Sequence, residues 1–317
     1  MQKIVILDTG YASYDYESAM FSKAGYALSI YDGPPEHEQL KYTFASEATG
    51  LLVRGTKIGK EVLQKMPLLK AIVRYGVGYD NIDLKAAFNK GIKIANVQGY
   101  ANHAVSDHAM ALMFACIRNI GKSHSEAFGK PFRPDVFELH DKTLGIIGIG
   151  RIGSVFSKKA SPLFSQTLAY DPYKNQEYIS ANLAIKKGLD ELLEKSHVIS
   201  IHCNLTKETH HLLTYALFKQ MKHRPVIINT ARGPVIREKD LLQALNKRMV
   251  HSAGLDVFED EPPGTAQEKL LSHPLVISTQ HIAWHSDYAM FELQRRAADN
   301  LLGLLRGNPV DDELIDT

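Results

Sequence analysis

A glycine-rich segment near the middle of the chain has the residues and the spacing of a nucleotide-binding loop. Gly148-Ile149-Gly150-Arg151-Ile152-Gly153 follows an apolar run and precedes a predicted helix. Its first glycine permits a tight turn, its second lets a pyrophosphate approach the backbone, and its third lets the helix pack closely on the strand. The N–H groups at the start of that helix attract phosphate. Asp171, at the end of the next predicted strand, can accept hydrogen bonds from ribose hydroxyls, which favours NAD over NADP.

Other interpretations of this segment stay open at this point. A turn of this kind can bind nothing, and related loops bind a flavin or S-adenosylmethionine. The strand before the loop, the helix after it and Asp171 together favour a dinucleotide. Lys174, three residues after Asp171, weakens the predicted preference for NAD a little.

Three further segments place a polar residue shortly after a predicted strand, and they carry Arg232, Glu261 and His281. Ligands of open α/β sheets bind at the carboxyl ends of the strands, so we expect these side chains in one cleft. A histidine exchanges protons near neutral pH, a carboxylate on its other ring nitrogen orients it and favours its charged form, and an arginine holds a carboxylate. Taken singly, each residue is more often a surface or packing residue, and the chain has fourteen histidines.

The order of these four segments resembles the D-isomer-specific 2-hydroxyacid dehydrogenases, from about Leu68 to Arg306. The resemblance implies that Arg232, Glu261 and His281 are catalytic. It further implies hydride transfer between NADH and a small 2-oxo acid to give a D-2-hydroxy acid, with His281 as general acid and, in reverse, as general base. The residues that it implies in cofactor binding are Gly148, Gly150, Arg151, Ile152, Gly153, Asp171, His202, Asn204, Thr209, Thr230, Ala231, Asp256 and Val105, with Asp256 at the nicotinamide.

The segment Val73–Asp83 resembles the substrate loop of the same family. There the backbone N–H groups of Val77 and Gly78 face the substrate carboxylate, although a glycine turn after a strand also explains the pattern. Arg74, Trp284, and the runs 202–205 and 210–212 resemble the branch of the C-terminal-binding-protein corepressors and their bacterial relatives. By that resemblance Arg74 and Arg232 contact the substrate, and Trp284 lines a pocket for an apolar or compact substituent.

The substrate itself is not determined by these residues. Hydroxypyruvate, glyoxylate, 3-phosphohydroxypyruvate and branched oxo acids all remain candidates. Arg54 and Lys57 can bind a phosphate, although cations in such positions more often form a solvated face. The adjacent His210 and His211 invite a metal interpretation, but no matching ligands accompany them, so we predict no metal site.

Two other functions on the same fold are alternatives to a 2-hydroxyacid dehydrogenase. One is an NADH-sensing corepressor-like scaffold, and the other is an oxidiser of phosphonate or phosphite. The corepressors carry long extra tails, whereas this chain ends soon after its last predicted helix, and its catalytic triad is intact. We therefore favour the dehydrogenase.

Short apolar runs alternate with helical segments along the whole chain, which predicts an α/β fold with parallel strands. The expected strands are 4–7, 27–31, 50–53, 70–73, 92–95, 143–147, 166–170, 198–202, 226–229, 252–255 and 275–278. The expected helices are 16–23, 59–65, 102–118, 151–159, 215–222, 237–246 and 288–305, the last packing on either domain. Residues 122–140 are expected to form a polar surface connection.

The resemblance also implies the domain arrangement: two doubly wound parallel-sheet domains, one inserted into the other. A Rossmann NAD-binding domain, residues 100–285, is expected to interrupt a flavodoxin-like substrate domain made of residues 1–99 and 286–317. The long helix after Asn102 is expected to cross between the domains and to contribute to a homodimer interface.

Composition excludes several other classes of protein. The 317 residues suffice for about two domains. Hydrophobic residues make up 44% and charged residues 23%, and the net charge is +2, which argues against a nucleic-acid or membrane-surface protein. The two cysteines, Cys116 and Cys203, are too few for a disulfide scaffold. With no apolar run long enough for a signal peptide or a membrane span, we expect a cytoplasmic protein.

Overall fold

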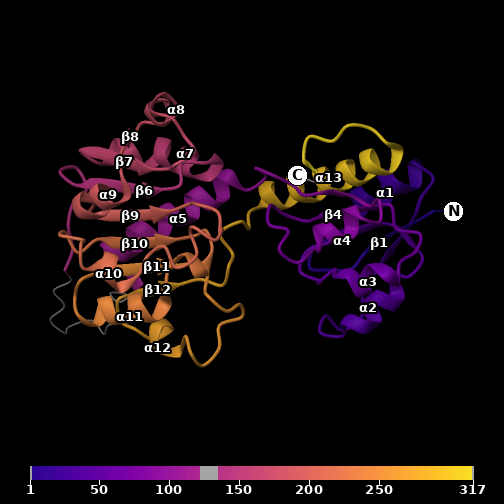
Figure 1. Cartoon of the computed structure of the whole chain (residues 1–317), viewed down its shortest axis with the longest axis horizontal. Coiled ribbons are helices and arrows are strands. Elements are labelled where there is room, and N and C mark those ends of the chain that lie inside the picture. The colour runs from indigo at the N-terminus through magenta and orange to yellow at the C-terminus, as the bar shows by residue number, and fades with distance from the viewer. Residues whose placement is uncertain (1, 122–134, 316–317) are drawn as a thin grey trace. The chain divides into compact units, whose positions relative to one another are not determined.

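The computed structural model describes residues 2–121 and 135–315 and divides the chain into two compact units (Figure 1). Unit 1 contains residues 1–100 and 286–317, and unit 2 contains residues 101–285. The chain therefore leaves the first unit, builds the second and returns. Each unit contains one sheet with its own buried core.

Unit 1 is built on a six-stranded sheet with the order β13-β5-β4-β3-β1-β2. Its central order, 2-1-3-4-5, is that of flavodoxin-like folds. The strands are parallel except β13, which pairs antiparallel with β5. The elements of unit 1 are β1 (Lys3–Ile6), α1 (Asp15–Lys23), β2 (Ala27–Ile30), α2 (Glu38–Phe44), β3 (Ala48–Val53), α3 (Lys60–Gln64), β4 (Ala71–Arg74), α4 (Leu84–Phe88), β5 (Lys93–Ala95), α13 (Asp287–Arg306) and β13 (Glu313–Leu314).

Unit 2 is built on a seven-stranded parallel sheet with the order β12-β11-β10-β9-β6-β7-β8. Counted within the unit, from the β8 edge, this order begins 3-2-1-4-5-6, as in Rossmann folds. Its elements are α5 (Asn102–Ile117), β6 (Thr143–Ile147), α7 (Arg151–Ala160), the 3₁₀ turn Ser161–Leu163, β7 (Gln166–Tyr170), α8 (Gln176–Ala181), β8 (Ile185–Lys186), α9 (Leu189–Lys195), β9 (Val198–Ile201), α10 (Tyr215–Phe218), β10 (Val226–Asn229), the 3₁₀ turn Gly233–Val235, α11 (Glu238–Asn246), β11 (Ser252–Leu255), α12 (Glu268–Leu271) and β12 (Val276–Ser278).

The central strands form where the sequence has short, continuous apolar runs. Every residue of β3, β6, β9, β10 and β11 is buried, as expected for parallel strands covered on both faces. The doubly wound α/β fold expected from the sequence is confirmed. The apolar stripe of helix α13 was compatible with packing on either domain. In the structure, α13 packs on β3 and β4 of unit 1.

The differences from the expected elements are local. Helix α10 ends at Phe218, four residues earlier than expected. The two-residue strands β8 and β13 and the short helices α2, α4, α8, α9 and α12 were not expected, because elements of this length show too few periods of hydrophobicity. Most of the expected connection at 122–140 lies outside the described residues. Within the described ranges no helix is long and apolar enough to span a membrane.

Candidate active site

The glycine loop of unit 2 has the backbone that a dinucleotide requires. Gly148 has φ 86°, and a Cβ there would lie 2.5 Å from the backbone nitrogen of Cys203. A Cβ on Gly153 would lie 2.2 Å from the carbonyl oxygen of Gly148, so any side chain would separate α7 from the loop. Gly150 is the N-cap residue of α7 and, having no side chain, forms no capping hydrogen bond with the first turn of the helix. A Cβ at Gly150 would meet no atom within 4 Å. The start of α7 therefore leaves its N–H groups and the space in front of them to a ligand.

Asp171 follows β7 directly and hydrogen-bonds the glycine loop. Its carboxylate accepts hydrogen bonds from the backbone N–H of Ile149 at 3.0 Å and from that of Tyr173 at 3.0 Å. Each carboxylate oxygen can accept a further bond, so the side chain holds the loop in shape and still has capacity for ribose hydroxyls.

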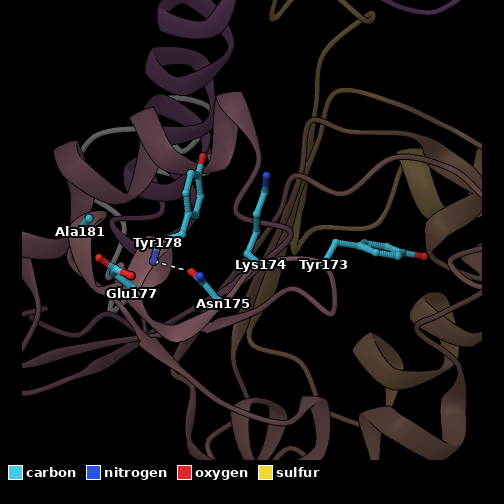
Figure 2. A pocket seen from close by; sticks show the side chains of 6 residues that line it. All are labelled: Tyr173, Lys174, Asn175, Glu177, Tyr178 and Ala181. Carbon is cyan, nitrogen blue, oxygen red and sulfur yellow. Dashed lines mark hydrogen bonds between the residues drawn. The ribbon is translucent and has the colours of Figure 1, made fainter.

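A pocket of about 500 Å³ follows directly after Asp171. It is lined by Tyr173, Lys174, Asn175, Glu177, Tyr178 and Ala181. Figure 2 shows the side chains of Lys174 and Tyr178 side by side, whereas Tyr173 points away from them. The ammonium of Lys174 lies 4.6 Å from the ring centre of Tyr178, a cation–π distance. This is the position where a dinucleotide on the glycine loop would place its adenosine.

The other predicted cofactor residues of unit 2 differ in how they are exposed. Arg151 and Asn204 are exposed, and Ile152, Thr209 and Ala231 are half-buried. Val105 is buried in α5, and Asp256 is fully buried. The buried hydroxyl of Thr230 has no hydrogen-bond partner among the residues that the structure describes, so it is available to a bound group.

His202 lies after β9, but its ring is directed into the protein. Its Nε2 is 2.8 Å from the hydroxyl of Ser200, and its ring packs on Phe156 with the ring centres 4.8 Å apart. Burial lowers the pKa of His202 to about 3. The imidazole is therefore neutral at physiological pH and supports the wall behind the loop.

His281 and Glu261 form the ion-pair geometry of an acid–base site. The Nδ1 atom of His281 lies 2.6 Å from a carboxylate oxygen of Glu261, whose other oxygen accepts the N–H of Phe258 at 3.1 Å. Burial acts to raise the pKa of Glu261, but the hydrogen bond and charge of His281, the N–H of Phe258 and the charge of Arg232 outweigh it and lower the pKa. The Nε2 of His281 has no partner in residues 2–121 and 135–315, so it faces an open position.

Asp256 holds the loop that carries His281. One carboxylate oxygen accepts the hydroxyl of Thr279 at 2.5 Å and the N–H of Ile282 at 2.9 Å, and the other accepts the N–H of Ala283 at 2.9 Å. Its backbone carbonyl accepts the N–H of His281 at 2.8 Å. These bonds keep His281 at φ 53°, a backbone conformation that a histidine rarely adopts. Sequence reasoning assigned Asp256 to the nicotinamide and did not reveal this role in the loop.

Two residues that sequence reasoning missed place Arg232. The side-chain oxygen of Asn229 accepts the N–H of Ala231 at 3.0 Å, and its amide donates to the carbonyl of Arg232 at 3.0 Å. A Cβ on Gly233 would lie 1.8 Å from the backbone carbon of Phe258. The absence of that Cβ lets the Arg232 segment approach the Glu261 segment. The partners of Asn229 lie within the run Asn229–Gly233 itself, whereas the backbone that Gly233 approaches, at Phe258 and Glu259, lies far along the chain.

A second histidine–glutamate pair stands beside the Glu261 segment. The Nε2 of His211 lies 2.7 Å from a carboxylate oxygen of Glu259, and the N–H of Glu259 donates to the carboxylate of Glu238 at 2.7 Å. Glu238 is the first residue of α11, so these contacts fasten the Glu259 segment to that helix and to His211. Among the described residues no group of three or more histidine, cysteine or acidic side chains can hold a metal.

The predicted substrate loop lies in unit 1, after β4. Val77 is exposed, and neither its N–H nor that of Gly78 has an acceptor in the part of the chain that the structure describes. Gly76 has φ 126°, and a Cβ there would lie 1.6 Å from an Nη atom of Arg74. The guanidinium of Arg74 thus occupies the space that a side chain at Gly76 would fill.

Trp284 belongs to unit 2, and its indole N–H donates to the carbonyl of His281 at 2.9 Å. The half-buried ring is therefore fastened to the loop that carries His281. The predicted substrate residues are thus divided between the units, with Arg74, Val77 and Gly78 in one and Arg232 and Trp284 in the other.

Comparison with known proteins agrees with this geometry. Residues 110–283 match the family model described as D-isomer specific 2-hydroxyacid dehydrogenase, NAD binding domain. A glyoxylate reductase of Thermofilum pendens is 35% identical over 290 residues, which are 87% of this chain and 84% of that protein. The chain spans about half the length of the D-3-phosphoglycerate dehydrogenases that it also matches.

Solved structures extend the similarity to the whole chain. TT0316 protein from Thermus thermophilus has a TM-score of 0.90 at 26% identity, with 99% of this chain and 100% of that chain covered. A D-lactate dehydrogenase from Aquifex aeolicus, complexed with NAD and lactic acid, has a TM-score of 0.83 at 28% identity, with 97% and 96% covered. The chain belongs to the D-isomer-specific 2-hydroxyacid dehydrogenase family, and residues 110–283 form the NAD-binding domain of that family.

Proposed function

We propose that this protein is an NAD-dependent D-2-hydroxyacid dehydrogenase that reduces a small 2-oxo acid with NADH. The observation that carries the proposal is the 2.6 Å contact between Nδ1 of His281 and Glu261, which leaves Nε2 of His281 without a partner among the described residues. An imidazole held in this way can give a proton to a carbonyl oxygen at Nε2 and take it back in the reverse reaction.

The three catalytic residues have separate tasks. Glu261, kept ionised by its lowered pKa, accepts the Nδ1 proton of His281 and so orients the ring. Arg232 presents a planar guanidinium that binds the substrate carboxylate and polarises the carbonyl to be reduced. Asp256 and Asn229 act through these residues by holding the loops on which they stand. Fixing acid and acceptor in one orientation supplies a large part of the rate acceleration.

Unit 2 is the NAD-binding domain, and unit 1 is proposed as the substrate-binding domain. The residues that would hold NAD are the glycine loop, the start of α7, Asp171 and the buried hydroxyl of Thr230. When bound, the cofactor supplies or accepts the hydride at its nicotinamide. In unit 1, the unbonded N–H groups of Val77 and Gly78 are suited to a carboxylate, and Arg74 adds a positive charge beside them.

We also propose that the enzyme works in the cytoplasm as a homodimer. Both cysteines are free, which suits a reducing compartment. Helix α5 leaves Met110 and Phe114 only partly buried, and these apolar side chains are suited to a subunit interface. Light scattering coupled to size-exclusion chromatography tests the dimer directly.

The activity is tested by NADH oxidation, followed at saturating NADH with a panel of 2-oxo acids. The panel contains pyruvate, glyoxylate, hydroxypyruvate and its 3-phosphate, and straight and branched oxo acids. We expect at least one member to be reduced to the D-hydroxy acid, identified by chiral chromatography. If none is reduced although NADH binds tightly, the dehydrogenase proposal is wrong and an NADH-binding scaffold takes its place. Turnover of NAD⁺ with phosphite, in the absence of oxo acid turnover, would point to a phosphite oxidiser.

A further inference from the structure

His211 is a residue that the sequence singles out and that the proposed function leaves without a role. It lies in the turn between β9 and α10 and is the second of two adjacent histidines, the first being His210. The sequence raised a metal site as a role for this pair, but no matching ligands accompany it. The contacts of His211 lead instead to the two segments that carry Arg232 and Glu261.

The backbone of His211 is bound to the segment of Arg232. Its N–H donates to the carbonyl oxygen of Pro234 at 2.7 Å, two residues after Arg232. The N–H of Leu213 donates to the carbonyl oxygen of Val235 at 3.1 Å, so the two segments run side by side over several residues. A shift of one segment would therefore break hydrogen bonds to the other.

The side chain of His211 is bound to the segment of Glu261. Its Nε2 atom lies 2.7 Å from a carboxylate oxygen of Glu259, two residues before Glu261. The Nε–H of Arg237 donates to Nδ1 of His211 at 3.5 Å, so Nδ1 is the acceptor nitrogen of the ring and Nε2 carries the proton. The ring therefore donates a charge-assisted hydrogen bond to the carboxylate of Glu259.

Glu259 belongs to a short run that is bonded tightly at both ends. Its N–H donates to a carboxylate oxygen of Glu238 at 2.7 Å, and its own carboxylate accepts the N–H of Glu238 at 3.4 Å. The carboxylate of Glu261 accepts the N–H of Phe258 at 3.1 Å, which closes the run from Phe258 to Glu261 on itself. A displacement of Glu259 would therefore displace Glu261 as well.

The backbone of His211 also has an unusual conformation. Its φ is 52°, in the left-handed region that a histidine rarely adopts, and the φ of His281 is 53°. Backbone conformations of this kind are strained, persist where surrounding bonds hold them, and gather at functional sites. The hydrogen bonds to Pro234 and Glu259 hold His211 in this conformation.

We propose that His211 is a positioning residue of the active site, which fixes the separation of Arg232 and Glu261. The inference rests on the proposed function, in which Arg232 binds the substrate carboxylate and Glu261 orients His281. Gly233 allows the two segments to approach because it has no Cβ, and His211 keeps them together with a bond to each. Since both groups must face one substrate molecule, a change in their separation misplaces the proton donor.

Removal of the ring should impair the chemistry and leave cofactor binding intact. His211→Ala should lower kcat/KM for the best 2-oxo acid by about 10–100-fold, mainly through kcat, since a misplacement of about 1 Å can cost this much. The dissociation constant of NADH should stay unchanged, because the glycine loop and Asp171 lie on other elements. The solvent isotope effect on kcat should rise, because proton donation by a badly oriented His281 becomes the slow step.

Further variants separate this role from a general effect on folding. His211→Gln, whose amide nitrogen can replace Nε2 as the donor, should restore much of the lost activity. Glu259→Ala should reproduce the loss, and the double variant should lose no more than either single variant, because both residues act through one bond. His210→Ala is the matched control and should stay fully active. Its exposed ring packs on that of His211 without a hydrogen bond to either segment in the described part of the chain.

Other outcomes overturn the proposal. Full activity of His211→Ala would show that this residue does not place Arg232 and Glu261. A lower kcat with an unchanged solvent isotope effect and no recovery in His211→Gln would show a structural role alone. If the wild type reduces no 2-oxo acid, the proposed function fails instead, and crystal structures of the wild type and His211→Ala decide the positioning. A longer Glu261–His281 contact in the variant would support it, and an unchanged contact would reject it.

Discussion

His281 is the residue on which the proposed chemistry depends most directly. Its ring is held from one side by Glu261 and its backbone by Asp256, so the open nitrogen has a defined direction. Fixing both the ring and the backbone is what general acid catalysis needs, because the proton must be delivered within hydrogen-bond distance of the carbonyl oxygen.

Replacement of His281 by alanine should lower kcat by about 10²–10⁴-fold, because the proton then has to come from water. The affinity for NADH should change little, since the glycine loop and Asp171 lie on other elements. Stopped-flow measurement of the hydride step and fluorescence titration with NADH check the two expectations. His285→Ala, four residues further on at an exposed position, is the control and should retain activity. A fully active His281→Ala enzyme would remove this residue from the chemistry.

The elements of unit 2 bring the three proposed catalytic residues together through close backbone contacts. Arg232, Glu261 and His281 follow three neighbouring strands, β10, β11 and β12, as the topology of a doubly wound sheet requires. Their separation is then set by how closely the three loops pack. Two of these loops approach closely at Gly233, because a Cβ there would lie 1.8 Å from the backbone carbon of Phe258 and 2.5 Å from the backbone nitrogen of Glu259.

Gly233→Ala should therefore separate the Arg232 and Glu261 segments. We expect a loss of about 1–3 kcal/mol in the free energy of unfolding, from overpacking, together with a lower kcat. Gly188→Ala is the matched control, because a Cβ at that helix cap meets no atom within 4 Å. Urea denaturation and steady-state kinetics of both variants test this expectation. Equal behaviour of the two variants would contradict the close approach at Gly233.

Sequence patterns predicted the buried central strands well, and they missed the two-residue strands and several short helices. β6, β7, β10 and β11 have the bounds that their apolar runs predict. The apolar stripe along residues 288–305 predicted helix α13. It did not predict that this helix packs on the sheet of unit 1, because an apolar stripe shows that one face of a helix is buried but not which surface covers it. The His281–Glu261 contact was an expectation from the resemblance, whereas the roles of Gly233 and Glu259 depend on contacts between loops that are distant in sequence.

At the scale of the whole molecule, the structure predicts sensitivity to acid. Burial lowers the pKa of His202 to about 3 and that of His197 to about 4, and it also lowers the pKa values of His251 and His273. His197, His251 and His273 stand shortly before the starts of β9, β11 and β12, along the amino edge of the unit 2 sheet. In the unfolded chain such histidines bind protons near pH 6.5.

Stability should therefore be complete above about pH 6.5 and should fall as the pH drops towards 4, because only the unfolded chain takes up these protons. For His202 alone, we expect a loss of about 2 kcal/mol in the free energy of unfolding between pH 6.5 and 5. Urea denaturation at pH 7 and pH 5 measures the loss, and His202→Asn should reduce its dependence on pH. The exposed His140, replaced by glutamine, is the control. Equal stability at both pH values would refute the expectation.

The sequence by itself determined the fold class, the family and the dinucleotide loop. These features depend on local backbone requirements, such as a glycine at a tight turn, and on apolar runs long enough to form strands. Only the tertiary structure decided how Asp256 holds the loop of His281, how Gly233 brings two segments together, and that His211 is bound to both of those segments. Each of these depends on a distance between residues far apart in the chain, which side-chain packing sets and which no local pattern contains.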